Sequence, residues 1–304
     1  MTLRHRLALA AAALLVTALG GCGSAAVPPA GAAAPAPSLD PPSASPSPSP
    51  SPSASPSPKP TAKPKPKPSR TLAKPTKTGG DLDGAKLPPP GADGVPVQGA
   101  GTFTPASGGT DIVGTGTTLV QYRVEVEDGI NWGTIPAWTT ARFATAVDQI
   151  IAAPRGWTAS ANAPITDPSQ HMTNASWSFQ RVSGPTYSVR IRLATPNTVD
   201  KLCGQYGVHT QGVYSCRYGQ TEMINLRRWL NGVPGFGITL DEYHTMVIDH
   251  EMGHFLGFDH MLCPGPGKPA PVMQTQTIDL GGCAANPYPY AADGTFITGP
   301  WAAS

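Results

Sequence analysis

The fold of this chain is decided by the stretch from His250 to His260, which reads HEMGHFLGFDH. On a helix, residues four apart lie on one face, so His250 and His254 can present two ring nitrogens to one ion. With His260 as a third neutral imidazole, a tetrahedral zinc keeps its fourth position for water, whose pKa the metal lowers to about 7. Glu251 lies next to the first histidine, so its carboxylate can take a proton from that water. The spacing therefore predicts a zinc site with three histidine ligands and Glu251 as the general base.

Gly257 makes the third ligand reachable. It stands three residues after the second histidine, where a helix that must stop and return His260 to the metal needs a left-handed residue. Glycine adopts that conformation without a Cβ penalty. We expect the helix to run from about 240 to 257, with Thr239 as its N-cap.

The alternative to a catalytic site is a zinc site that only holds the fold. Structural zinc sites are normally closed by four protein ligands, usually including cysteine, whereas here a carboxylate stands where a base is needed. His244 is not expected to be a ligand, because its six-residue distance from His250 does not place both on one helix face. We expect His244 on the surface or next to the ligands.

The N-terminus has the order of a secretory signal. Two arginines among the first six residues precede an apolar run over residues 7–19. The run ends at Leu-Gly-Gly-Cys22, which resembles the bacterial lipobox, in which the cysteine is lipidated and becomes the mature N-terminus. The alternative is an ordinary signal cleaved within residues 23–34. We expect residues 1–21 to be a lipoprotein signal peptide, and Cys22 to anchor the protein outside the cell, on the outer face of the bacterial membrane.

A disordered spacer is expected over residues 22–94, where Pro, Ser, Ala and Lys dominate and little can be buried. Such chain favours extended polyproline II, at roughly 3.1 Å per residue. Residues 1–77 carry nine basic and one acidic side chain, whereas residues 78–304 carry 12 basic and 18 acidic ones. The basic spacer would contact anionic cell-wall polymers or lipid head groups, or simply stay solvated. Nucleic acid is not an expected partner of an exported, acidic domain.

Four cysteines follow Cys22 in the chain: Cys203, Cys216, Cys263 and Cys283. An even set in an exported domain suggests two disulfides, and the sequence leaves three pairings open. The nearest-neighbour pairing, 203 with 216 and 263 with 283, would close two short loops, the second of them beneath the metal site. Cysteine zinc ligands are disfavoured because no CxxC spacing occurs.

Residues 95–304 are expected to form one domain, because about 210 residues suffice for a sizeable core. Apolar periodicity predicts strands and one further helix, with Pro136 opening the helix. The expected ranges are 118–127 (strand), 136–153 (helix), 177–182 and 187–194 (two strands joined as a hairpin), and 222–229 (strand).

The last of these strands has two interpretations. It is either an edge beside the cleft, where a peptide substrate could add a strand, or an ordinary internal strand. Arg227 and Arg228 within it are expected to be solvated.

The histidine motif is followed by Met273 in the Pro-rich turn PAPVMQ, residues 269–274, and together they resemble the metzincin zinc peptidases. In that group the methionine forms a turn beneath the metal without binding it, which the resemblance implies for Met273. No Met-x-Tyr follows, so a tyrosine ligand at that place is absent. Most of residues 115–290 also resembles a family of exported actinobacterial proteins with a domain of unknown function.

The resemblance implies an α+β, metzincin-like domain: a twisted mixed sheet, an active-site helix and an irregular C-terminal subdomain. It implies a zinc metallopeptidase that cleaves protein or peptide bonds. With the N-terminal signal, we expect the enzyme at the cell surface, and we expect it to be a monomer. Two alternatives stay open: a non-catalytic, wall-associated binding module with a stabilising zinc, and a hydrolase of cell-wall peptides.

Overall fold

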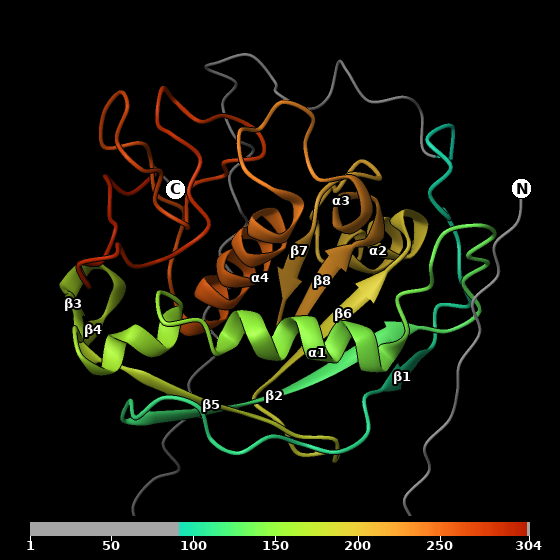
Figure 1. Cartoon of the computed structure of the whole chain (residues 1–304), viewed down its shortest axis with the longest axis horizontal. Coiled ribbons are helices and arrows are strands. Elements are labelled where there is room, and N and C mark those ends of the chain that lie inside the picture. Colours follow the sequence, from blue (N-terminus) through green and yellow to red (C-terminus); the bar gives the residue numbers. More distant parts are fainter. Residues whose placement is uncertain (1–90, 303–304) are drawn as a thin grey trace, which may run out of the picture. The chain divides into compact units, whose positions relative to one another are not determined.

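The structure is a computed structural model that describes residues 91–302. The expected signal peptide, Cys22 and all but the last residues of the expected spacer lie outside the described residues. The chain forms a mixed α+β fold around one six-stranded sheet (Figure 1). Its elements are β1 (Phe103–Pro105), β2 (Thr118–Glu127), α1 (Thr140–Ile151), η1 (Trp157–Ala161), β3 (Ile165–Asp167), η2 (Pro168–Gln170), β4 (Met172–Ala175), β5 (Trp177–Arg181), β6 (Val189–Ala194), α2 (Pro196–Gly204), β7 (Cys216–Tyr218), β8 (Thr221–Asn225), α3 (Leu226–Asn231) and α4 (Leu240–Leu256).

Strand β2 organises the sheet, and it has the bounds that the sequence predicts. It pairs antiparallel with β1 and parallel with both β5 and β6. Val182 N–H donates to the carbonyl of Tyr122, and Ser188 N–H donates to the carbonyl of Gln121. Successive carbonyls of a strand point to opposite sides, so β5 and β6 lie on either side of β2. The predicted hairpin is therefore wrong: alternation identified both strands but carried no information about their partners.

Beyond β6 the sheet continues to β8 and ends at β7, which pairs antiparallel with β8. Of the two interpretations of the 222–229 segment, the internal strand is correct and the edge is wrong. The strand also ends earlier than expected, at Asn225, whose side chain accepts from the N–H of Arg227 and caps α3. Polar capping here overrides the apolar run that follows.

Arg227 and Arg228 are buried, which corrects the expectation that they are solvated. Arg227 Nε lies 2.6 Å from Asp93 Oδ2, and Arg228 Nη1 donates to the carbonyl of Gly232 at 2.7 Å. Both charges have partners from distant or irregular segments, which a local pattern cannot show.

Helices α1 and α4 lie on one face of the sheet, and α2 lies on the other (Figure 1). Helix α1 begins at Thr140 after the N-cap Thr139, not at Pro136, and it buries an apolar stripe that includes Phe143 and Val147. The main core lies between this face and the two helices. A smaller cluster between α2 and the sheet includes the disulfide Cys203–Cys216.

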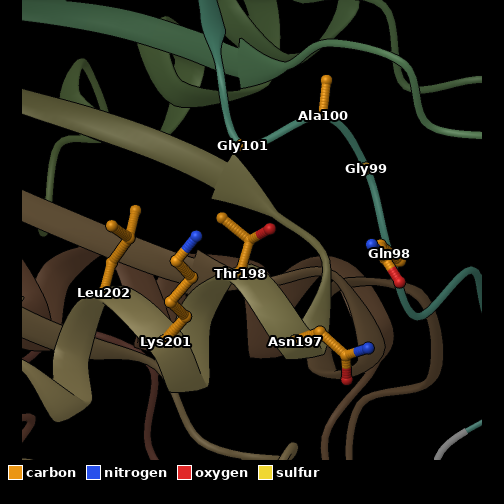
Figure 2. Close-up of a pocket in the computed structure, with 8 residues that line it drawn as sticks. All are labelled: Gln98, Gly99, Ala100, Gly101, Asn197, Thr198, Lys201 and Leu202. Atoms are coloured by element: carbon orange, nitrogen blue, oxygen red, sulfur yellow. The ribbon is translucent and has the colours of Figure 1, made fainter.

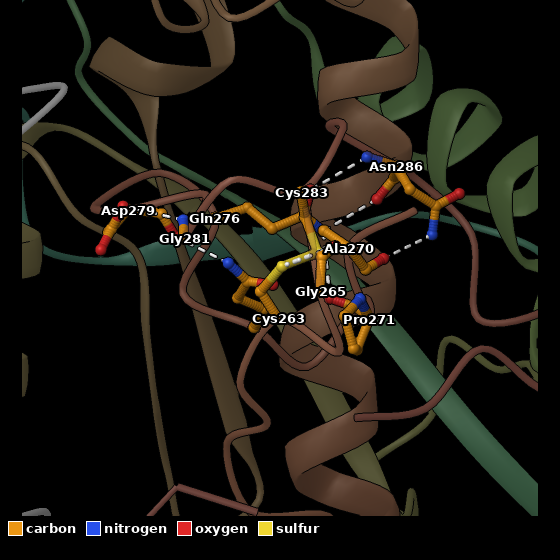
Figure 3. Close-up of a disulfide and its surroundings, with 10 residues drawn as sticks. Cys263, Gly265, Ala270, Pro271, Gln276, Asp279, Gly281, Cys283 and Asn286 are labelled. Atoms are coloured by element: carbon orange, nitrogen blue, oxygen red, sulfur yellow. Dashed lines mark hydrogen bonds between the residues drawn. A yellow bond between two sulfur atoms is a disulfide. The ribbon is translucent and has the colours of Figure 1, made fainter. Parts of the chain in front are cut away.

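After α4, residues 257–302 form no helix or strand, only isolated bridges such as that of Met261 with Gln274. The second disulfide, Cys263–Cys283, joins two turns of this segment (Figure 3). Beside it, Asn286 Nδ2 donates to the carbonyl of Ala270 at 2.8 Å. The nearest-neighbour pairing of the four cysteines is thus confirmed, and side-chain hydrogen bonds replace regular structure here.

Within residues 91–302, no helix combines the length and the apolar character needed to cross a bilayer.

Candidate metal centre

Helix α4 carries the first two histidines of the motif. Thr239 caps it as predicted: its side chain accepts from the N–H of Glu242, whose carboxylate accepts in turn from the N–H of Thr239. The carboxylates of the first turn lie at the positive end of the helix dipole.

His244, expected on the surface or beside the ligands, is instead buried in an aromatic cluster. Its ring stacks on Trp229 with centroids 3.7 Å apart, and its Nε2 lies 2.6 Å from the Trp229 carbonyl oxygen. It packs α4 against α3 and is not part of the histidine cluster.

Gly257 ends α4 in the left-handed conformation, with φ of 110°, which confirms the predicted role of this glycine. The chain then turns back, and His260 meets the two helical histidines. One ligand nitrogen from each of His250, His254 and His260 lies within 4.8 Å of the other two. Among the described residues, no other group of three or more His, Cys, Asp or Glu side chains has this geometry.

Backbone carbonyls orient two of the three rings. His250 Nδ1 lies 2.8 Å from the oxygen of Val272, and His254 Nδ1 lies 2.8 Å from the oxygen of Phe258. A carbonyl only accepts, so each Nδ1 carries the proton and each Nε2 keeps a free lone pair. Nε2 of His254 lies 3.1 Å from Nε2 of His260. Two nitrogens bound to one tetrahedral zinc stand about 3.3 Å apart, so this spacing fits a shared ion.

Burial keeps the three rings neutral, which is the form that binds metal. It lowers the pKa of His250 and lowers that of His254 well below the ordinary value. Burial, followed by the charge of His250, lowers the pKa of His260 to about 3.

Glu251 lies on the same turn of α4 and is 6 % exposed. Burial raises the pKa of its carboxyl to about 8, and the positive charge of Arg217 acts in the opposite direction. Arg217 was not singled out by sequence reasoning. Its position next to Glu251 follows from the pairing of the short strands β7 and β8, and the alternation of apolar residues along a strand does not reveal which strands pair.

Met273 is fully buried against α4. A Cβ added at Gly253, the residue before His254, would clash with the Met273 sulfur and stand 2.8 Å from Trp157 Cζ2. The methionine therefore packs directly against the turn of helix that carries the histidines. Trp157 also packs against this turn of α4, and its Nε1 donates to the carbonyl of Asp249 at 2.9 Å. The sequence had indicated no role for it at the site.

A shallow hollow elsewhere is lined by segment 98–101 and by residues of α2 (Figure 2). None of the predicted site residues lines it. Glu127 lies beside it and accepts hydrogen bonds from the hydroxyls of Thr195 and Thr198, at 2.7 and 2.6 Å. These contacts tie α2 to β2 and give the carboxylate a structural role.

Comparison with known proteins assigns the chain to a family. No curated protein and no solved structure matches it. Residues 88–286 match the family model described as "Protein of unknown function (DUF3152)", a range that includes the three histidines and both disulfides. The chain therefore belongs to this family of proteins of unknown function, as the resemblance to a family with such a domain led us to expect.

Proposed function

We propose that this protein is a zinc-dependent peptidase of metzincin type, with His250, His254 and His260 as the metal ligands and Glu251 as the general base. The observation that carries the proposal is the convergence of three histidine nitrogens within 4.8 Å, with Glu251 on the same helical turn. Three observations support the metzincin comparison. Met273 packs against that turn of α4, the sheet is mixed, and the segment after α4 has no helix or strand.

The donor set fits zinc. All three donors are neutral imidazoles, which zinc prefers, and no fourth protein ligand closes the cluster among the described residues. Nε2 of His254 has a free lone pair and lies 3.1 Å from Nε2 of His260, close to the spacing of two nitrogens on one ion. When bound, zinc would supply Lewis acidity and a water of lowered pKa.

Each residue of the site would have its own role in the hydrolysis of a peptide bond. The carbonyls of Val272 and Phe258 hold two imidazoles in the ligating tautomer. Glu251 takes a proton from the attacking water as its oxygen bonds to the carbonyl carbon of the substrate. As the C–N bond breaks, Glu251 passes that proton to the leaving amine. The products are one carboxylate and one amine, and no side chain becomes acylated.

Strand β7 offers a place for an extended substrate. It contacts α4 and is the last strand of the sheet among the described residues, so its outer edge has no strand partner there. An extended peptide could add to this edge through main-chain hydrogen bonds. We also propose that the site acts outside the cell, on a chain anchored through Cys22, as its N-terminal sequence predicts.

The test is cleavage by the zinc-loaded full chain. We expect about one zinc per chain, and hydrolysis of an unfolded protein that is lost with chelator and reduced at least about 100-fold in Glu251→Gln, because general-base catalysis contributes about 10²–10⁴-fold. Glu242→Gln, nine residues nearer the start of the same helix, is the matched control and should keep its activity.

Two results would contradict the proposal. If the zinc-loaded chain cleaves nothing in a broad peptide library or in purified cell wall, the peptidase assignment is wrong. If Glu251→Gln cleaves as fast as the native chain, Glu251 is not the base. New amines released only from cell wall would assign the site to cell-wall peptides.

A further inference from the structure

A half-buried arginine and a fully buried glutamate face α4 from the sheet. Arg217 on β7 and Glu222 on β8 are directly opposite each other in the antiparallel register. Their neighbours Cys216 and Met223 belong to the cluster on the α2 side. Because side chains alternate along a strand, Arg217 and Glu222 lie on the opposite, α4 side of the sheet.

Part of each side chain has no hydrogen-bond partner in the described part of the chain. Glu222 is fully buried, and neither of its carboxyl oxygens has a partner there; the same is true of Arg217 Nε. A buried ionisable group without hydrogen bonds is costly unless an opposite charge lies near it. Burial, followed by the charge of Glu251, raises the pKa of Glu222, and the charge of Arg217 acts in the opposite direction. Arg217 is therefore a cation that offsets part of the cost of burying Glu222.

The guanidinium of Arg217 also reaches the helix turn that carries the general base. Its central carbon lies 5.9 Å from the ring centroid of Phe255. Phe255 is four residues after Glu251, so both lie on the same face of α4. The guanidinium therefore lies beside the face of α4 that carries Glu251, and Arg217 is opposite Glu222 in the sheet. Its positive charge lowers the pKa of both carboxyls, against the larger raising effect of burial.

We infer that Arg217 is a positioning residue whose positive charge keeps the Glu251 carboxylate in place near the histidine cluster, with Glu222 as the buried carboxyl opposite it in the sheet. The inference rests on the proposed function. It assigns a role to Arg217 on the edge strand β7 and to the otherwise unexplained buried carboxyl of Glu222 on the internal strand β8. A residue of this kind acts through Glu251 and does not touch the substrate.

The kinetic test compares Arg217→Met with Arg190→Met in the zinc-loaded full chain. Arg190 is the matched control because it lies on the other face of the same sheet, where its Nε donates to Thr221 Oγ1. We expect Arg217→Met to lower kcat at least about ten-fold with KM within about two-fold, since a misplaced base weakens the transition state and not substrate binding. Arg217→Lys should recover part of kcat, and added guanidinium ion should partly rescue Arg217→Ala.

A second measurement is independent of activity. Thermal unfolding of the metal-free full chain is compared for Arg217→Met, Glu251→Gln and the double variant, and likewise for Arg217→Met with Glu222→Gln. We expect both double variants to lose less in Tm than the sum of their single changes, because groups in one charged network are coupled. This readout remains available if the native chain cleaves nothing, so failure of the proposed function and failure of this inference are distinguishable.

Three results would overturn the inference. Additive Tm changes for Arg217 with Glu251 would mean that the two are not coupled. A raised KM with unchanged kcat in Arg217→Met would make Arg217 a substrate-binding group. An equal loss of kcat in Arg190→Met would indicate a general effect of sheet arginines.

Discussion

At the scale of single residues, Gly253 is the most constrained position of the site. It lies between the two helical histidines, and its missing Cβ leaves room for the Met273 sulfur and the Trp157 ring. We expect Gly253→Ala to destabilise the protein by about 1–3 kcal/mol, because overpacking forces the neighbours to move. Chemical denaturation measures the loss.

The control for Gly253→Ala is Gly204→Ala at the end of α2, where an added Cβ meets nothing within 4 Å. It should be neutral or stabilising by up to about 1 kcal/mol. If both variants unfold at the same denaturant concentration as the native chain, the contact between Met273 and α4 is looser than described.

Two buried tyrosines set the alkaline limit of stability. Tyr122 donates to Asp148 and Tyr290 donates to the carbonyl of Ala163, and burial raises the pKa of both. The folded state therefore favours the neutral phenol. Its contribution to stability is complete below the ordinary pKa of about 10 and is lost as pH rises above it. We expect these tyrosinates to appear only together with unfolding, in an alkaline titration followed by tyrosinate absorbance and by circular dichroism.

Replacement of a buried tyrosine by Phe identifies its share of the tyrosinate absorbance in that titration. Tyr122→Phe should remove absorbance from the cooperative step, because this phenol is buried and donates to Asp148. Early ionisation of Tyr122 in a folded chain would contradict its burial.

At the scale of elements, the disulfide Cys263–Cys283 braces the segment that packs against the histidine cluster. That segment supplies the Val272 carbonyl to His250 and carries Met273. We expect Cys263→Ala with Cys283→Ala to cost about 3 kcal/mol of stability and to weaken zinc binding about ten-fold or more, because the groups that orient a ligand lose their support. Calorimetric unfolding and competition with a zinc-binding dye measure the two effects.

The other disulfide gives the comparison. Cys203 with Cys216 ties α2 to β7 on the far side of the sheet from α4, so its removal should lower Tm by a similar amount with a smaller effect on zinc affinity. Equal losses of zinc affinity would show that the bridge near the metal has no special role.

At the scale of the whole molecule, the histidine cluster lies beside the core, and the fold does not depend on a bound ion alone. The sheet, α1 and most of α4 pack around apolar side chains that need no ion. We expect chelation to lower Tm. The free energy of unfolding should fall by about 2.7 kcal/mol relative to the chain with zinc at 100 times its Kd. The far-ultraviolet circular dichroism at room temperature should stay unchanged. Loss of the helical signal on chelation would favour a binding module with a stabilising zinc.

The local features of the site follow from the sequence alone. The helix bounds near Thr239 and Gly257 follow from capping chemistry, which acts over a few residues, and β2 follows from period-two alternation. The nearest-neighbour disulfides were one of three pairings and became certain only when the cysteines were placed in space.

Only the tertiary structure decided which distant segments meet. It placed β2 between β5 and β6, made β7 the edge, and buried Arg227 against Asp93. It also opposed Arg217 to Glu222 beneath the helix of the histidines. Local periodicity records which face of an element is buried but not the partner that covers it. The residues of the candidate site on α4 could therefore be predicted from one stretch of sequence. The charged residues around them could not, because their position depends on the order of the strands.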